Sequence, residues 1–166
     1  MDAYLNFIDR VNNVVKYLVS ILFIALVVLV FMQVVTRFII NYPLSWTEEI
    51  SRYLMIYIVF IGSALAVRTN EHIAIDFLLE IISPKNKKRL NIITLFISVL
   101  FFAMLTYFGF QLTLIVFDQA TPTLQFSMAW AYAAIPAGSL LMILNVFAVL
   151  IQMKKRGMSE TEGEVQ

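Results

Sequence analysis

Between Lys16 and Arg37 the chain reads YLVSILFIALVVLVFMQVVT, residues 17–36, with no charged side chain. The hydrocarbon core of a bilayer is about 30 Å thick, and a helix needs roughly 20 apolar residues to cross it. This run meets that requirement by itself and predicts a membrane-spanning helix. Arg37 and Phe38 follow it where a signal peptide would have a small-residue cleavage site, so we expect the helix to be retained.

Three further uncharged runs follow, at residues 53–67, 90–117 and 119–153. The first of these is short, so its helix is expected to begin near Trp46, and the last helix is expected to begin near Met128, after a polar loop. We therefore expect an all-α integral membrane protein with four transmembrane helices. Their expected bounds are about 15–40, 46–68, 88–117 and 128–152, within a single membrane domain at 1–158 that precedes an acidic, flexible tail at 159–166.

The composition excludes several classes of protein. Of the 166 residues, 61% are hydrophobic and 14% are charged, whereas soluble domains have about 25% charged residues. A net charge of +1 gives no basic surface for nucleic acid. With no cysteine and a single histidine, the chain cannot supply thiolate or multi-histidine metal sites. It also has no phosphate loop and no nucleophile with a candidate base, so we expect no cofactor and no enzymatic activity.

The basic residues indicate the orientation of the chain. Cytoplasmic loops of membrane proteins carry an excess of Lys and Arg. Of the 12 Lys and Arg residues, all but Arg37 and Arg52 lie in the N-terminal segment, in the connection at 68–89 or in the C-terminal tail. Both termini are therefore expected to be cytoplasmic.

The connection between the second and third spans contains a predicted amphipathic helix. His72, Asp76 and Glu80 recur every four residues on one face, and apolar residues occupy most of the rest. We expect this helix, at about 72–83, to lie flat in the inner interface against lipid headgroups. The basic residues expected to contact headgroups beside it are Arg68, Lys85, Lys87, Lys88 and Arg89. A proton relay between His72 and Asp76 is the less favoured alternative. A second interfacial helix is expected at residues 4–15.

One stripe of the second helix combines charged and small side chains. At 100° per residue its members share one side of the helix: Glu48, Arg52, Met55, Val59, Gly62 and Ala66, with Ser63 beside them. The expected helix-packing face consists of Met55, Val59, Gly62, Ser63 and Ala66. Small side chains let another helix approach closely, and we expect that helix to come from this chain or from a partner.

The other half of the stripe is charged and lies at the outer end of the helix. Glu48 and Glu49 precede Arg52 by four and three residues, so either can pair with it, and Arg37 ends the preceding helix. We expect these four residues to form a neutral cluster. The expected outer-rim residues are Arg37, Trp46, Glu48, Glu49, Arg52 and Tyr53. Two interpretations stay open, a docking surface for a partner and an ion-pair cluster that orients the first two helices.

The fourth helix contains Pro136, with Gly138 two residues further on. Proline has no backbone N–H, so it removes one hydrogen bond of the helix. We therefore expect a kink at these residues.

The spans lack the features of a complete carrier. Secondary transporters commonly use broken helices and a polar site near the middle of the membrane. No span here carries a charge at mid-depth. An accessory or scaffold subunit fits this pattern better, and the alternative is a self-contained homo-oligomeric carrier or channel.

A series of short motifs runs through the second helix, the connection after it and the fourth helix. They are WTEEISRY (46–53), FIGSA (60–64), Arg68 before HIAID (72–76), and then Trp130, Tyr132 and IPAG (135–138). These motifs resemble the small membrane subunit of tripartite ATP-independent periplasmic (TRAP) transporters, which has W-x-E-E-x-x-R-Y opening its second helix, then F-x-G-x-A, then a basic residue before H-x-x-x-D. The resemblance covers nearly the whole chain. Since the chain stops after the fourth helix, we expect the separate-subunit form of the family and not a fusion with the large subunit.

The resemblance implies a role and partners. Such systems take up carboxylates, for example sialic acid or C4-dicarboxylates, by symport with an ion. They use a periplasmic substrate-binding protein, a large membrane subunit that holds the substrate and ion sites, and this small subunit. The resemblance therefore implies a multi-pass protein of the bacterial cytoplasmic (inner) membrane. It is expected to form a heterodimer with the large subunit, to brace it, and to offer outer surface to the binding protein.

Overall fold

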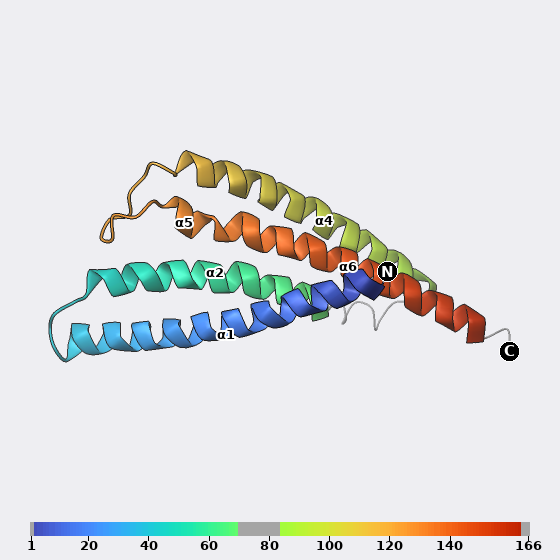
Figure 1. Ribbon diagram of the computed structural model, residues 1–166, viewed down its shortest axis with the longest axis horizontal. Helices are drawn as coiled ribbons and strands as arrows, with labels where there is room; N and C mark the ends of the chain where they lie inside the picture. The colour runs from blue at the N-terminus through green and yellow to red at the C-terminus, as the bar shows by residue number, and fades with distance from the viewer. Residues whose placement is uncertain (1, 70–83, 164–166) are drawn as a thin grey trace.

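Helices account for most of the described residues, 2–69 and 84–163, in this computed structural model (Figure 1). They are α1 (Asp2–Phe38), α2 (Ser45–Thr69), α4 (Pro84–Ile115), α5 (Ala129–Tyr132) and α6 (Ala134–Gly163). Four segments of the described chain are long and apolar enough to cross a membrane. The prediction of an all-α membrane protein with four spans is therefore confirmed.

The long helices lie in a row, in the order α1, α2, α6, α4 (Figure 1). Both termini lie toward the same end of the long helices, which we name the termini end. The connections at 39–44 and 116–128 lie at the opposite end of the helices, which we name the loop end. If all four spans cross the membrane, this arrangement agrees with termini on the same side of it. That this side is cytoplasmic stays a prediction.

Helix α1 begins well before the expected first span. It is continuous from Asp2, so residues 4–15 form its first turns instead of a separate interfacial helix. Its 37 residues give a length of about 55 Å at 1.5 Å per residue, which exceeds the hydrocarbon core. The hydroxyl of Tyr4 donates to the carbonyl of Leu144, at 2.9 Å, and so holds these turns against α6.

Helix α6 also continues past the expected end of its span, to Gly163. Its backbone thus extends into the segment at 159–166 that the sequence predicts to be a flexible tail. The flexibility of that tail and the single domain at 1–158 stay predictions.

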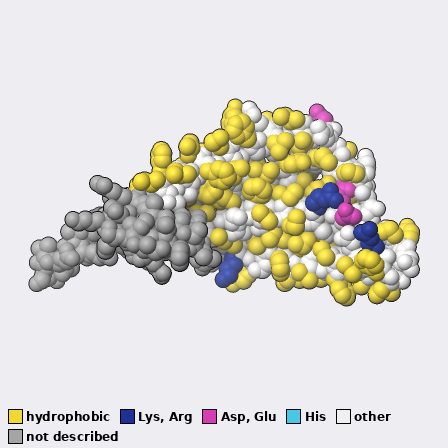
Figure 2. All heavy atoms as spheres, turned by 180° about the vertical axis from the view of Figure 1, so that it is seen from behind, with side chains coloured by type: hydrophobic (Ala, Val, Ile, Leu, Met, Phe, Trp, Pro, Cys, Tyr) yellow, Lys and Arg dark blue, Asp and Glu magenta, His cyan; other side chains and the backbone are white. Residues whose placement is uncertain are grey.

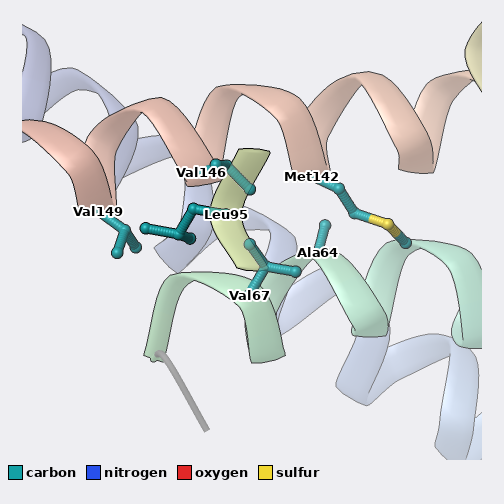
Figure 3. Close-up of a cluster of buried hydrophobic side chains, with 6 residues drawn as sticks. All are labelled: Ala64, Val67, Leu95, Met142, Val146 and Val149. Carbon is teal, nitrogen blue, oxygen red and sulfur yellow. The ribbon is translucent and has the colours of Figure 1, made fainter. Parts of the chain in front are cut away.

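The apolar core lies between α2, α4 and α6, near the termini end (Figure 3). Its buried members are Ala64 and Val67 of α2, Leu95 of α4, and Met142, Val146 and Val149 of α6. Most other apolar side chains of α1 and α4 are exposed. In a bilayer this costs nothing, because lipid tails are as apolar as the side chains, and helix association depends on packing and hydrogen bonds.

Helices α2 and α6 approach closely where Gly138 faces Phe60. A Cβ atom placed on Gly138 would lie 2.7 Å from the Cβ of Phe60 and 2.8 Å from its carbonyl oxygen. These are atoms of, or next to, the backbone of α2, so they cannot move aside as a flexible side chain would. The absence of a side chain at Gly138 is what allows the two central helices to touch.

We predict that Gly138→Ala destabilises the protein by roughly 1–3 kcal/mol, because the added methyl group overpacks this contact. The measurement is thermal or denaturant unfolding of the purified chain in detergent. Gly62→Ala is the matched control, since its Cβ would lie 3.9 Å from Val19, an ordinary contact distance. Equal losses of stability in the two variants would contradict the prediction.

Candidate functional site

The first turns of α2 bring polar side chains to the loop end. Thr47 is fully buried, and its hydroxyl donates to the carbonyl of Leu44 at 2.7 Å. Glu49 is 7% exposed, whereas Glu48 and Arg52 lie on the surface. Successive residues of a helix point in different directions, so the two adjacent carboxylates have different surroundings and different partners.

Glu49 ties α2 to the connection at 116–128. Its Oε2 accepts a hydrogen bond from the backbone N–H of Thr123 at 2.8 Å, and its Oε1 accepts one from the hydroxyl of Tyr53 at 3.1 Å. Hydrogen bonds to an ionised carboxylate are roughly twice as strong as neutral ones. We name this arrangement of Glu49, Tyr53 and Thr123 the Glu49 clamp.

The loop that the clamp holds is itself well bonded. The backbone N–H of Thr121 donates to the carbonyl of Phe126 at 2.7 Å, and the Thr121 hydroxyl oxygen accepts the N–H of Phe126 at 3.2 Å. Gln125 has a φ of 57°, the left-handed conformation that few side chains adopt. An antiparallel bridge pairs Ala120 with Ser127. These contacts give the loop one defined shape.

The charged cluster differs from the expected one. Arg52 Nη2 lies 3.0 Å from Glu48 Oε1, as an exposed i,i+4 pair. Glu49 does not join it, because its side chain faces the loop, and Arg37 makes no ion pair with any described residue. An exposed pair of this kind contributes about 0–1 kcal/mol. It is therefore free to exchange partners at little cost.

A pocket of about 290 Å³ opens between α2, the loop and α5. The side chains lining it are Ser45, Glu48, Glu49, Arg52, Tyr53, Ile56, Pro122, Thr123, Met128, Ala131 and Tyr132. It presents the paired Arg52 guanidinium and Glu48 carboxylate beside the clamped carboxylate of Glu49. The described residues contain no group of three or more His, Asp or Glu side chains placed to hold a metal ion.

The expected helix-packing face is largely open in the isolated chain. Met55, Val59, Ser63 and Ala66 are exposed, and we name their surface the open face of α2. Gly62 at its edge faces Val19 of α1 at contact distance. The space-filling view shows a largely hydrophobic face on which most acidic and basic side chains lie toward one end, with a further basic side chain apart from them (Figure 2). That a further helix packs on the open face stays a prediction.

Arg68 finds partners within the chain at the termini end. Its Nη2 lies 2.9 Å from Asp9 Oδ1, and its Nη1 donates to Gln152 Oε1 at 2.8 Å, so it joins α1, α2 and α6. The other residues predicted to meet headgroups are not tested. Three of them lie outside the described residues, namely His72, Asp76 and Glu80. The other four lie in the first turns of α4, where the structure describes only the backbone: Lys85, Lys87, Lys88 and Arg89.

A pair of asparagines that the sequence analysis did not single out joins the same helices. The amides of Asn12 and Asn145 donate to each other, at 2.7 and 3.0 Å, and Asn145 also donates to the carbonyl of Ala64 at 2.6 Å. Asn145 is 2% exposed. The available signal was an amide within an uncharged helical run, because such groups form hydrogen bonds between helices in membranes.

The fourth span is interrupted at Ala133, which separates α5 from α6. Pro136 lies in the first turn of α6, and Gly138 lies against Phe60 as described above. Helical hydrogen bonds continue across this point. The N–H of Ala133 donates to the carbonyl of Ala129 at 2.8 Å, and the N–H of Ala137 donates to the carbonyl of Ala133 at 3.2 Å. That the helix is kinked at Pro136 and Gly138 stays a prediction.

We predict that Glu49→Gln loosens the loop at 116–128, because an amide cannot accept both hydrogen bonds of the clamp as well as a carboxylate does. The expected cost is about 1–3 kcal/mol, which should speed amide hydrogen exchange at Thr123 by about five- to 150-fold. Glu48→Gln is the control and should leave this exchange unchanged. Equal protection of Thr123 in both variants would show that the clamp does not hold the loop.

Comparison with known proteins places the chain in a family. Residues 26–156 match the family described as tripartite ATP-independent periplasmic transporters, DctQ component. The chain is 28% identical over 139 residues to the sialic acid TRAP transporter permease protein SiaT of Haemophilus influenzae, which covers 81% of this chain and 22% of SiaT. It is 26% identical over 146 residues to the sialic acid TRAP transporter small permease protein SiaQ of Vibrio cholerae, covering 87% of this chain and 84% of SiaQ.

A third relative is the C4-dicarboxylate TRAP transporter small permease protein DctQ of Rhodobacter capsulatus, 27% identical over 116 residues, or 69% of this chain and 51% of that protein. Another, TeaB of Halomonas elongata, is named for ectoine. The chain thus spans about a fifth of SiaT, about half of this DctQ and most of SiaQ. With its four spans it is a multi-pass protein of the bacterial inner membrane. The family match extends over most of its length, and the chain belongs to the DctQ-component family of tripartite ATP-independent periplasmic transporters.

Proposed function

We propose that this chain is the small, accessory membrane subunit of a TRAP-type secondary transporter, and that it braces the large, ion-coupled membrane subunit. Its family is a transporter component and not an enzyme. Relatives named as small permease proteins support the role, and so does the match to part of the much longer SiaT.

The distribution of charge is the observation that carries the bracing role. Among the described residues, the stretches at 17–36, 53–67, 92–115 and 134–153 contain no Asp, Glu, Lys or Arg. A site for a charged substrate or an ion inside the membrane would need such groups or broken helices near mid-depth. We therefore assign the substrate and ion sites to the large subunit and a static role to this row of helices.

The open face of α2 is the surface we assign to the large subunit. It runs along a central helix of the row, it is exposed in the isolated chain, and Ser63 and Ala66 are small. Small side chains let a partner helix approach to close packing distance, and packing is what drives association of helices in lipid.

The pocket at the loop end is the surface we assign to the periplasmic binding protein. Its Glu48–Arg52 pair is exposed and weak, and the Glu49 clamp fixes the loop beside it. Charged rims of this kind steer association and set its rate more than its affinity.

For the substrate we propose a carboxylate of the sialic acid or C4-dicarboxylate class, taken up by symport with an ion. This proposal is supported by the names of the relatives. The relative named for ectoine shows that the family is not restricted to these two substrates.

The first experiment is a pull-down of the tagged chain from its native membranes in mild detergent, with intact-mass analysis of what remains bound. We expect one much larger multi-span protein in equal amount. Ser63→Trp, which fills the open face, should lower its recovery at least severalfold, and Phe96→Trp, at an exposed position of α4, should not. Recovery of this chain alone as a discrete oligomer would support the homo-oligomeric carrier or channel instead.

A charge-swap pair separates the two interpretations of the Glu48–Arg52 pair. If the pair docks the binding protein, Arg52→Glu and the double variant Arg52→Glu with Glu48→Arg should both lower uptake by the assembled transporter severalfold, more at low salt than at high salt. The double variant restores an ion pair inside this chain, but the positive and negative charges have exchanged places and no longer complement the charges of the binding protein. Full recovery of uptake in the double variant would show that the pair serves only to orient this chain.

A further inference from the structure

A groove of about 640 Å³ lies between α1 and α2 at the termini end, away from the pocket assigned to the binding protein. The residues lining it are Asp9, Asn12, Asn13, Lys16, Leu65, Ala66, Arg68 and Thr69. We propose that this groove binds the headgroup of one anionic phospholipid, such as phosphatidylglycerol. The proposal does not rest on the transport function.

The charges of the groove leave one cation uncompensated. Its only carboxylate among the lining residues, Asp9, is already bonded to Arg68 through Nε at 3.0 Å and Nη2 at 2.9 Å. Lys16 is exposed and makes no ion pair with a described residue. Among its described lining residues the groove therefore carries a net positive charge, held on an exposed lysine that a phosphate group can reach.

Donors for a phosphate oxygen are also present. A guanidinium has five N–H groups, and the structure gives hydrogen bonds for two of those of Arg68, from Nε to Asp9 and from Nη1 to Gln152. The amide of Asn13 is exposed. By contrast Asn12 bonds Ile8 and Asn145, and the hydroxyl of Thr69 bonds the backbone of its own helix, so these two shape the groove.

The position of the groove matches that of a phospholipid headgroup. Lys16 is the last charged residue before the uncharged run of α1, and Arg68 is the first after that of α2, so both mark the edge of the hydrocarbon. Helical spacing puts Phe23 and Val27 on the same side of α1 as Lys16, and both are exposed. A headgroup in the groove would thus place its acyl chains along an apolar stripe. Basic pockets between membrane helices are known to bind anionic headgroups.

The test is native mass spectrometry of the full-length chain, titrated with phosphatidylglycerol, with phosphatidylcholine of the same acyl chains, or with inorganic phosphate. We expect wild type to bind phosphatidylglycerol at least about fivefold more tightly than phosphatidylcholine, and inorganic phosphate not to compete at equal concentration. Lys16→Ala should weaken phosphatidylglycerol binding about fivefold, the equivalent of one lost basic contact. Lys16→Arg should retain it.

Lys155→Ala is the matched control. It removes the same charge at the same end of the molecule, from a lysine that pairs with Asp2 at 2.7 Å and does not line the groove. This variant should bind phosphatidylglycerol like wild type. Equal weakening by both alanine variants, or no preference for phosphatidylglycerol in wild type, would overturn the proposal. Competition by inorganic phosphate would show a free-anion site in place of a lipid site.

Discussion

The close contact between α2 and α6 at Gly138 is the constraint on which the rest of the structure depends. With no side chain on that residue, α6 rests directly on the backbone of α2 at Phe60. The core at Ala64, Met142 and Val146 continues the same interface toward the termini end. The outer helices are then added to this central pair, α1 against α2 and α4 against α6 (Figure 1).

Polar interactions complete the assembly at both ends of the row. The Glu49 clamp holds the loop over α2 at the loop end, and Arg68 with the Asn12–Asn145 pair joins three helices near the termini end. The middle of the described spans is left to apolar packing and to hydroxyls such as that of Ser139, which donates back to the carbonyl of Ile135. Fixed ends and an uncharged middle in the described spans are what the proposed scaffold role would require.

Much of this fold could be predicted from the sequence, because charge is nearly absent from the parts of a helix that face lipid. Uncharged runs therefore marked all four spans. The bounds were less accurate, since α1 continues through polar residues that α2 and α6 hold in place. Spacing suggested that Arg52 could pair with either neighbouring glutamate. It could not show that Glu49 turns to a loop more than seventy positions further along the chain, because that contact depends on where α5 and α6 lie. Asn145 was missed for the same reason, as its partners come from two other helices.

Because the helices form a row that is one helix thick, much of the protein is in contact with what surrounds it in the membrane. A closed bundle hides much of each helix, whereas this chain leaves apolar surface on α1, α2 and α4 in contact with lipid or a partner. Its perimeter is therefore long for its mass. Mismatch between a hydrophobic helix and the bilayer costs fractions of a kcal/mol per Å, and it acts on each helix that faces lipid. Such a subunit therefore meets its surroundings along a broad apolar surface, which lipid and a partner helix can share.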